Sequence, residues 1–165
     1  SYILKQNFGI QLPEKMKEEM SYISKSISDA QHKELTPEWI YEVFESEYMG
    51  TSHIFRIDEC HFKQQDGIIA EVTIEYNKRY KVLNGKGNGR LDAVSNALKQ
   101  YFSVNYEISC YEEHALEKGS SSKAISYVGI TCDDKLYWGV GVDPDIIKSS
   151  IQALIAAINR SGQIS

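Results

Sequence analysis

The chain has 165 residues, of which 42% are hydrophobic and 25% charged, and its formal net charge is −5 at pH 7. A chain of this length suits one domain with a small appendage, and the mild negative charge gives little support to a nucleic-acid-binding face. No apolar run approaches the ~20 residues that a membrane span requires. Three cysteines without a C-x-x-C spacing, and no recognisable targeting segment, argue against a disulfide framework and favour a cytoplasmic location.

The first fifty residues predict two amphipathic helices. In the first, over residues 14–30, apolar side chains recur at spacings of three and four, at Met16, Met20, Ile23, Ile27 and Ala30. The second begins where Thr36 offers an N-cap and Pro37 suits the first helical position. Gly50, Thr51 and Ser52 then break the pattern. We therefore predict a helical linker subdomain over residues 1–50.

Beyond that boundary the hydrophobic period falls to two. Residues 70–76 alternate apolar with polar side chains, which is typical of a strand with one buried face. Strands are also predicted over residues 53–63 and 80–83, and a glycine-rich loop then leads into a helix over residues 91–102. The first unit, about residues 51–102, is therefore a βββα repeat.

The same order recurs in the rest of the chain. Strands are predicted over residues 104–110, 124–132 and 136–142, and Asp143 and Pro144 are the expected N-cap and first residue of a final helix. The two halves align when Gly87 is paired with Gly141 and Arg90 with Pro144. We predict an α+β fold in which a domain over residues 51–165 contains two βββα repeats, about 51–102 and 103–165.

Both repeats place glycines between a strand and a helix, at "GKGNGRLDAV" and "GVGVDPDIIK". The free N–H groups at a helix start can bind an anion, and glycine lets the backbone approach it. The P-loop pattern is absent, and Gly85, Gly87 and Gly89 do not fit the dinucleotide pattern. Two interpretations stay open: a small carboxylate ligand, or glycines that only turn a strand into a helix.

Other groupings give no active site. Among His32, His53, His61, His114, Cys60, Cys110 and Cys132, only Cys110 and His114 are four residues apart, and Cys110 lies in a predicted strand, so no metal site is predicted. A nucleophile and base formed by Cys110 and His114 lacks an orienting acid. Glu112 and Glu113 are adjacent on a strand and point to opposite faces.

Three stretches in order, "GNGRLDAVSNALK", "YEEHALEKGSSSKAISYV" and "YWGVGVDPDIIKSSIQALIAAINR", resemble the C-terminal regulatory domain of 2-isopropylmalate synthase. Upstream, "SYILKQNFGIQLPEKM" and "LTPEWIYEVFESEY" resemble the linker subdomains of that family. The resemblance implies a duplicated βββα domain that binds L-leucine as feedback inhibitor of leucine synthesis and forms a homodimer. The family's catalytic barrel, with its divalent metal, has no counterpart here, so the resemblance implies a regulatory fragment without cofactors or synthase activity of its own.

The resemblance also implies the residues of the leucine pocket. In the first repeat, backbone groups surround the polar end of the amino acid and an acid meets its ammonium, at Gly87, Asn88, Gly89, Leu91 and Asp92. The second repeat contributes Ile108, Tyr111, Ala115, Ser122, Ala124, Pro144 and Ile146. Tyr2 matches a family tyrosine that reaches the active site of the neighbouring subunit.

The sequence departs from the family pattern at two places. Arg90 stands where proline is usual, and serines in "KGSSSK" replace common acids and alanines. The related regulatory domain of citramalate synthase senses isoleucine, and a shifted methyl group discriminates by only about 1–3 kcal/mol. Three alternatives therefore stay open: an isoleucine-sensing domain, a module for dimerisation only, and an enzyme in its own right.

Overall fold

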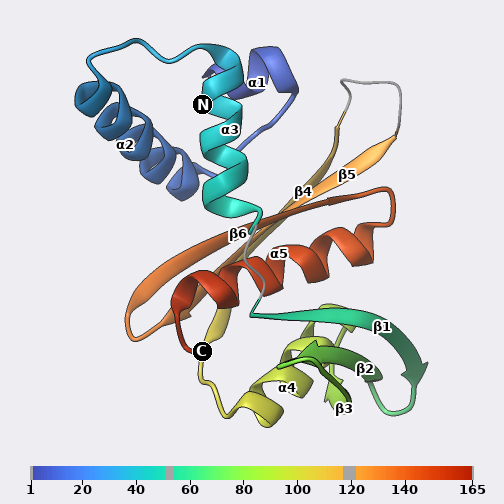
Figure 1. The fold of residues 1–165 in the computed structure, drawn as a ribbon. Coiled ribbons are helices and arrows are strands. Elements are labelled where there is room, and N and C mark those ends of the chain that lie inside the picture. The colour runs from blue at the N-terminus through green and yellow to red at the C-terminus, as the bar shows by residue number, and fades with distance from the viewer. Residues whose placement is uncertain (1, 51–53, 117–121, 165) are drawn as a thin grey trace.

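A computed structural model describes residues 2–50, 54–116 and 122–164 (Figure 1). The N-terminal helices are α1 (Tyr2–Phe8), α2 (Glu14–Gln31) and α3 (Pro37–Tyr48). The first repeat contains β1 (Phe55–Gln64), β2 (Ile68–Tyr76), β3 (Arg79–Gly87) and α4 (Arg90–Phe102). The second contains β4 (Glu107–Leu116), β5 (Lys123–Cys132), β6 (Lys135–Asp143) and α5 (Ile146–Ser161). The predicted α+β fold with a duplicated βββα order is confirmed.

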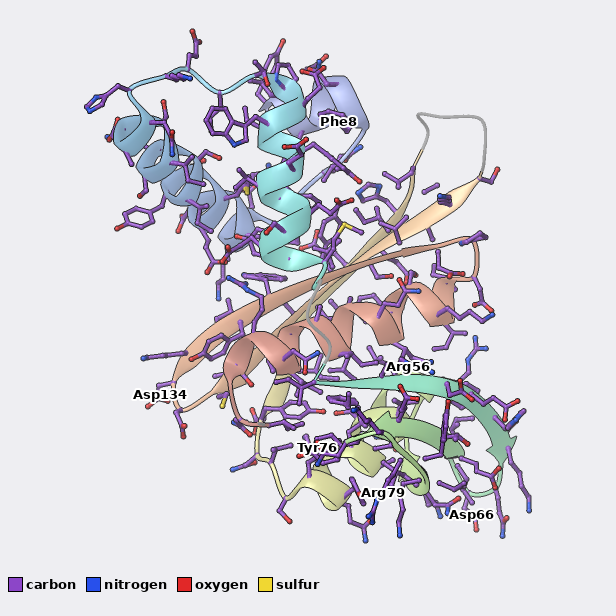
Figure 2. All side chains as sticks on the ribbon, in the orientation of Figure 1. Phe8, Arg56, Asp66, Tyr76, Arg79 and Asp134 are labelled. Carbon is purple, nitrogen blue, oxygen red and sulfur yellow. The ribbon has the colours of Figure 1, made fainter. Side chains whose placement is uncertain are left out.

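Each repeat forms its own antiparallel sheet, with strand orders β1-β2-β3 and β4-β5-β6. The hairpins β2–β3 and β5–β6 close through two residues with positive φ, Asn77 and Lys78 in the first and Asp133 and Asp134 in the second. Two successive positive φ angles are the requirement of the turn that matches the twist of paired strands. Asp134 is visible at the tip of its hairpin (Figure 2).

Each helix lies unusually close to a strand of its own repeat. A Cβ added to Gly85 would lie 2.3 Å from the Ala93 carbonyl oxygen, and one on Gly139 would lie 2.1 Å from that of Ala153. Real Cβ atoms do not approach a backbone oxygen so closely, so only glycine permits this packing. The same contact in both repeats makes Gly85 equivalent to Gly139 and Ala93 equivalent to Ala153.

This equivalence confirms one predicted pairing and corrects another. A Cβ on Gly87 would lie 2.6 Å from the Ala93 nitrogen, and one on Gly141 would lie 2.9 Å from the Ala153 nitrogen, so these glycines correspond. The pairing of Arg90 with Pro144 is wrong, because three residues before Ala153 stands Ser150. The second repeat extends its strand past Gly141 to Asp143 and starts its helix a turn earlier, at Ile146.

The start of α5 also differs from the prediction. The N-cap is Asp145, whose Oδ1 accepts a hydrogen bond from the Ile147 backbone N–H at 2.9 Å. Asp143 instead ends β6, paired with Ala124, and accepts a hydrogen bond from the Asp145 N–H. Aspartates stand on both sides of Pro144. Because Asp143 is paired within the sheet, Asp145 is the residue that caps α5.

Two further boundaries differ. The strand predicted over residues 104–110 is found as β4, which begins at Glu107 and continues to Leu116. Tyr106 belongs to the connection before it, where its hydroxyl lies 2.7 Å from Ser95 Oγ and only 3% of the residue is exposed. The buried Tyr106 fits the alternating pattern of a strand although it lies in a connection, which is why the predicted strand begins too early. The short helix α1 was not predicted, and the strand predicted from His53 begins outside the described residues.

The second sheet is covered on both faces (Figure 1). On one face Ile125, Tyr127 and Trp138 pack with buried side chains of α1–α3, and on the other Val128 and Ile130 pack with α5. The first sheet is covered on one face only, because its buried residues on β2 alternate with polar residues that face outward. The helical layer therefore contacts mainly the second repeat. The predicted division of the chain after residue 50 stays a prediction.

Candidate functional site

A β-bulge aligns the three residues predicted on β4. Ile108 pairs with Ile130, Tyr111 with Val128 and Ala115 with Ala124, and the register shifts between Ile108 and Cys110. In a regular strand, residues three apart point to opposite faces, but the extra residue of a bulge restores a common face. Because Val128 and Ile130 face α5, Ile108, Tyr111 and Ala115 face it as well.

The start of α5 adds a polar cluster beside Tyr111, formed by Tyr111, Ser126, Ser149 and Ser150. The Tyr111 hydroxyl hydrogen-bonds with Glu113 and with Ser150. The Ser126 and Ser149 hydroxyls lie 2.7 Å apart, and both are buried. Burial, followed by the neighbouring Glu113, raises the pKa of Tyr111. Several hydroxyl groups therefore lie at one end of the apolar face that β4 and β5 turn toward α5.

All residues predicted from the second repeat except Ile108 lie near this cluster. Ala115 and Ala124 are directly paired, and Ala124 is also paired with Asp143 at the end of β6. Tyr111 is 42% exposed and Ile146 43% exposed, which leaves both accessible to a small ligand. Ile108 lies farther along the strand, at the other end of the sheet. Ser122 and Pro144 are exposed at the edge of this region.

Residues predicted from the first repeat lie at the start of α4. Asp92 Oδ2 accepts a hydrogen bond from the Asn88 backbone N–H at 2.9 Å, and a Cβ on Gly87 would lie 2.4 Å from the same oxygen. The N-cap Gly89 has no side chain with which to cap the helix, and a Cβ there would meet no atom within 4 Å. Asp92 therefore closes the loop, while the space beside Gly89 stays open. Leu91 is half-buried and packs at the edge of the main core.

Arg90 does not turn toward this loop. Its guanidinium carbon lies 6.0 Å from the centre of the Phe62 ring on β1, a weak cation–π contact. Within the described ranges, no hydrogen bond or ion pair joins the loop of the first repeat to the cluster beside Tyr111. The predicted site residues thus fall into two separate groups, one at the start of each repeat's helix, which are called the two candidate half-sites below.

A separate groove of about 840 Å³ lies between β1 and α5. No predicted pocket residue lines it; its apolar wall consists of Ile57, Phe62, Ile147, Ile151 and Ile155, and its rim carries charges of both signs. The sequence pattern does not predict this groove, because the alternation in β1 is interrupted by a bulge between Ile57 and Glu59. Burial raises the pKa of Cys60 in this groove to about 11, the opposite of what a reactive thiol requires.

His114 is engaged in the contact between β4 and the helical layer. Its Nε2 accepts a hydrogen bond from the Gln11 backbone N–H at 3.3 Å and lies 2.8 Å from the Tyr127 hydroxyl. A nitrogen already engaged by these two groups is a poor general base for Cys110. Within the described ranges, no group of three or more His, Cys, Asp or Glu side chains has the arrangement of a metal site, and no helix there is long and apolar enough to cross a membrane. Tyr2 is 74% exposed at the start of α1.

Comparisons with known proteins agree with this architecture. The profile of a family described as the LeuA allosteric (dimerisation) domain matches residues 34–161. Proteins named 2-isopropylmalate synthase are similar to the chain: one from Desulfitobacterium hafniense is 44% identical over 96% of the chain, and one from Helicobacter hepaticus is 40% identical over 97%. A third, from Schizosaccharomyces pombe, is 31% identical over 99% of the chain. The chain spans only 29–30% of the length of these relatives.

Proposed function

Because this chain belongs to the LeuA allosteric (dimerisation) domain family, we propose that it is the leucine-binding regulatory domain of a 2-isopropylmalate synthase. The chain covers less than a third of relatives with that name, so the proposal assigns the synthase reaction and its metal to the part that the chain does not cover. The family description also supports a homodimer.

The observation that carries leucine binding is the bulge in β4. It places Ile108, Tyr111 and Ala115 on one strand face and sets Tyr111 beside the start of α5. Leucine needs fixed dipoles for its carboxylate and ammonium and a dry surface for its isobutyl group. Burial of that group contributes roughly 1.5–3 kcal/mol. A half-exposed apolar face with hydroxyl groups and helix-start amides at one end supplies both kinds of surface.

The other half-site, at the start of α4, offers groups that can bind the polar end of an amino acid. The loop from Gly87 to Gly89 leaves open space beside a helix start, and Asp92 supplies a negative charge next to it. In the proposal the amides bind the carboxylate and Asp92 attracts the ammonium. Inhibition then requires that leucine bind one arrangement of the parent enzyme more tightly than another.

The test is thermal unfolding of the chain without ligand and with leucine, isoleucine or valine. A ligand that binds only the folded state stabilises it by RT ln(1 + [L]/Kd), about 2.7 kcal/mol at a hundredfold excess over Kd. We expect the largest increase in Tm with leucine, and we expect Tyr111→Ala to abolish it. Tyr80→Ala is the matched control, because Tyr80 is exposed on the outer face of the first sheet.

The other outcomes identify the alternatives. A largest increase with isoleucine would assign the chain to the sensing domain of a citramalate synthase. No increase with any of the three amino acids would contradict leucine binding and leave a module for dimerisation, with glycines that only shape the turns.

A further inference from the structure

Arg160, near the end of α5, joins elements far apart in the sequence. Its Nη2 donates to Glu47 Oε1 on α3 at 2.7 Å, and its Nη1 lies 3.4 Å from Glu19 Oε1 on α2. Nη1 also donates to the Trp138 carbonyl oxygen on β6 at 3.0 Å. The guanidinium carbon lies 4.7 Å from the centre of the Tyr48 ring. One side chain thus contacts two helices of the helical layer and the second sheet.

These groups form a closed network, named here the Arg160 network: Arg160, Glu19, Glu47, Tyr48 and the Trp138 carbonyl. The Tyr48 hydroxyl donates to Glu19 Oε1 at 2.7 Å, and burial together with Glu19 raises the pKa of Tyr48. Only 21% of the Arg160 side chain is exposed, and Tyr48 is fully buried. The Glu19 and Glu47 side chains are 35% and 40% exposed, so the network is partly open to water where the end of α5 meets α2 and α3 beside the edge strand β6.

This arrangement differs from an ordinary surface ion pair. Exposed pairs contribute little, because water screens them and two flexible side chains must be ordered. A half-buried guanidinium offers its donors to several acceptors in a fixed plane, and its loss leaves carboxylates without their cation. Lysine has neither the planar group nor its directional donors. Arg160 forms hydrogen bonds and ion pairs with Glu19 on α2 and Glu47 on α3, and so joins both helices to α5.

The helix α5 runs from the proposed leucine site at its start to the Arg160 network at its end. Its first turn carries Ser149 and Ser150 beside Tyr111, in the proposed leucine site, and its last turn carries Arg160. We propose that the Arg160 network couples the helical layer to α5, so that binding of leucine at the start of α5 changes how firmly α2 and α3 are held. This inference deepens the proposed function and depends on it for the identity of the ligand. The coupling itself depends on the Arg160 network alone.

The first experiment measures the coupling without ligand, by hydrogen exchange of the chain. In Arg160→Met we expect exchange of the α2 and α3 amides to rise about tenfold, because a local opening costs less once charged hydrogen bonds are lost. Exchange in α4 should stay unchanged. Arg79→Met is the matched control, since Arg79 is exposed on the first sheet, far from α1–α3 (Figure 2). Glu47→Gln removes a single charge and serves if Arg160→Met does not fold.

The second experiment repeats the measurement with saturating leucine. In the unmodified chain we expect slower exchange both in the first turns of α5 and in α2 and α3. In Arg160→Met, and in Arg160→Lys, leucine should still slow exchange in α5 but no longer in α2 and α3.

The two ideas fail in different ways. If α2 and α3 exchange equally fast in the unmodified chain, Arg160→Met and Glu47→Gln, the coupling is overturned. The coupling is also overturned if leucine still slows the exchange of the α2 and α3 amides in Arg160→Met. If leucine changes no exchange rate while the network variants loosen α2 and α3, the proposed function fails and the coupling is supported.

Discussion

Asp92, which is proposed to attract the ammonium of leucine, also accepts a hydrogen bond from the Asn88 backbone. One of its carboxylate oxygens accepts the Asn88 N–H, which closes the loop before α4. Gly89 cannot cap that helix with a side chain, and the Asp92 hydrogen bond fastens the loop before the helix rather than capping its free amides. The charge that would attract an ammonium and the oxygen that closes the loop thus belong to the same side chain.

Two substitutions separate these roles. Asp92→Asn keeps an oxygen acceptor and removes the charge, so we expect little change in stability but weaker leucine binding. Asp92→Ala removes both, and we expect an additional loss of about 1 kcal/mol in the free energy of unfolding, the typical contribution of one hydrogen bond. Chemical denaturation and calorimetric titration measure the two quantities. Equal leucine affinity in all three proteins would contradict a role for Asp92 in binding.

Three buried tyrosines make the fold sensitive to alkali. Burial raises the pKa of Tyr48, Tyr106 and Tyr127 above the ordinary value of about 10, and that of Tyr106 to about 12. The folded state therefore holds these protons more tightly than the unfolded state. The contribution of these tyrosines to stability should be constant below pH 10 and fall as the pH rises from about 10 to 12.

Tyrosinate absorbance and circular dichroism during an alkaline titration test this expectation. We expect the exposed tyrosines, such as Tyr2 and Tyr22, to ionise while the fold persists. The buried ones should ionise together with loss of the circular dichroism signal. Tyr106→Phe should shift unfolding to higher pH. A folded protein with all its tyrosines ionised would contradict the burial described here.

At the scale of elements, the helices depend on close approach to their strands. In both repeats a glycine faces the helix backbone at a distance that excludes a side chain. Gly139→Ala would push the Ala153 carbonyl or the strand away, which costs typically 1–3 kcal/mol or more. Gly85→Ala should act in the same way on α4.

Gly89→Ala is the matched control for these substitutions, because a Cβ there meets open space. Its φ of −141° is ordinary for alanine, so we expect a change within about 0.5 kcal/mol. Urea denaturation of the three variants measures the difference. Similar stability of Gly139→Ala and Gly89→Ala would contradict the close packing.

Local signals in the sequence predicted most elements but not their exact ends. Thr36 caps α3 as expected, since Trp39 N–H donates to its hydroxyl at 3.2 Å. The start of α5 was missed because two aspartates suit an N-cap, and only the pairing of Asp143 with Ala124 decides between them. The seven-residue helix α1 has little intrinsic stability and depends on burial of Leu4.

The candidate site shows the same limit. The resemblance named Ile108, Tyr111 and Ala115, but their spacing of three and four is irregular for a strand. Only the bulge in β4, which has no signature in the sequence, brings them to one face. The cluster of Ser126, Ser149 and Ser150 was also missed, because serines on a strand and a helix look like ordinary surface residues until the two elements are packed.

At the scale of the whole molecule, the helical layer covers a large apolar surface of the second sheet. Tyr127, Trp138 and Val140 are almost fully buried beneath it. A chain without residues 1–50 would expose these side chains, and exposed apolar patches of this kind promote association.

We therefore expect that truncated chain to bind a hydrophobic dye, to form larger assemblies in size-exclusion chromatography, and to show red-shifted tryptophan emission. Replacement of Trp138 and Tyr127 by polar residues in the truncated chain should reduce the association. A truncated chain of unchanged assembly state and emission would show that the helical layer is dispensable for this sheet.

The coverage of the second sheet on both faces also bears on how the two repeats diverge. Nearly every side chain of β5 contacts either the helical layer or α5, whereas every second residue of β2 faces water. Most substitutions in β5 must therefore preserve volume and polarity, while half of the positions in β2 are free to drift. Although the repeats share one architecture, β5 should accept fewer substitutions than β2, and its sequence should evolve more slowly.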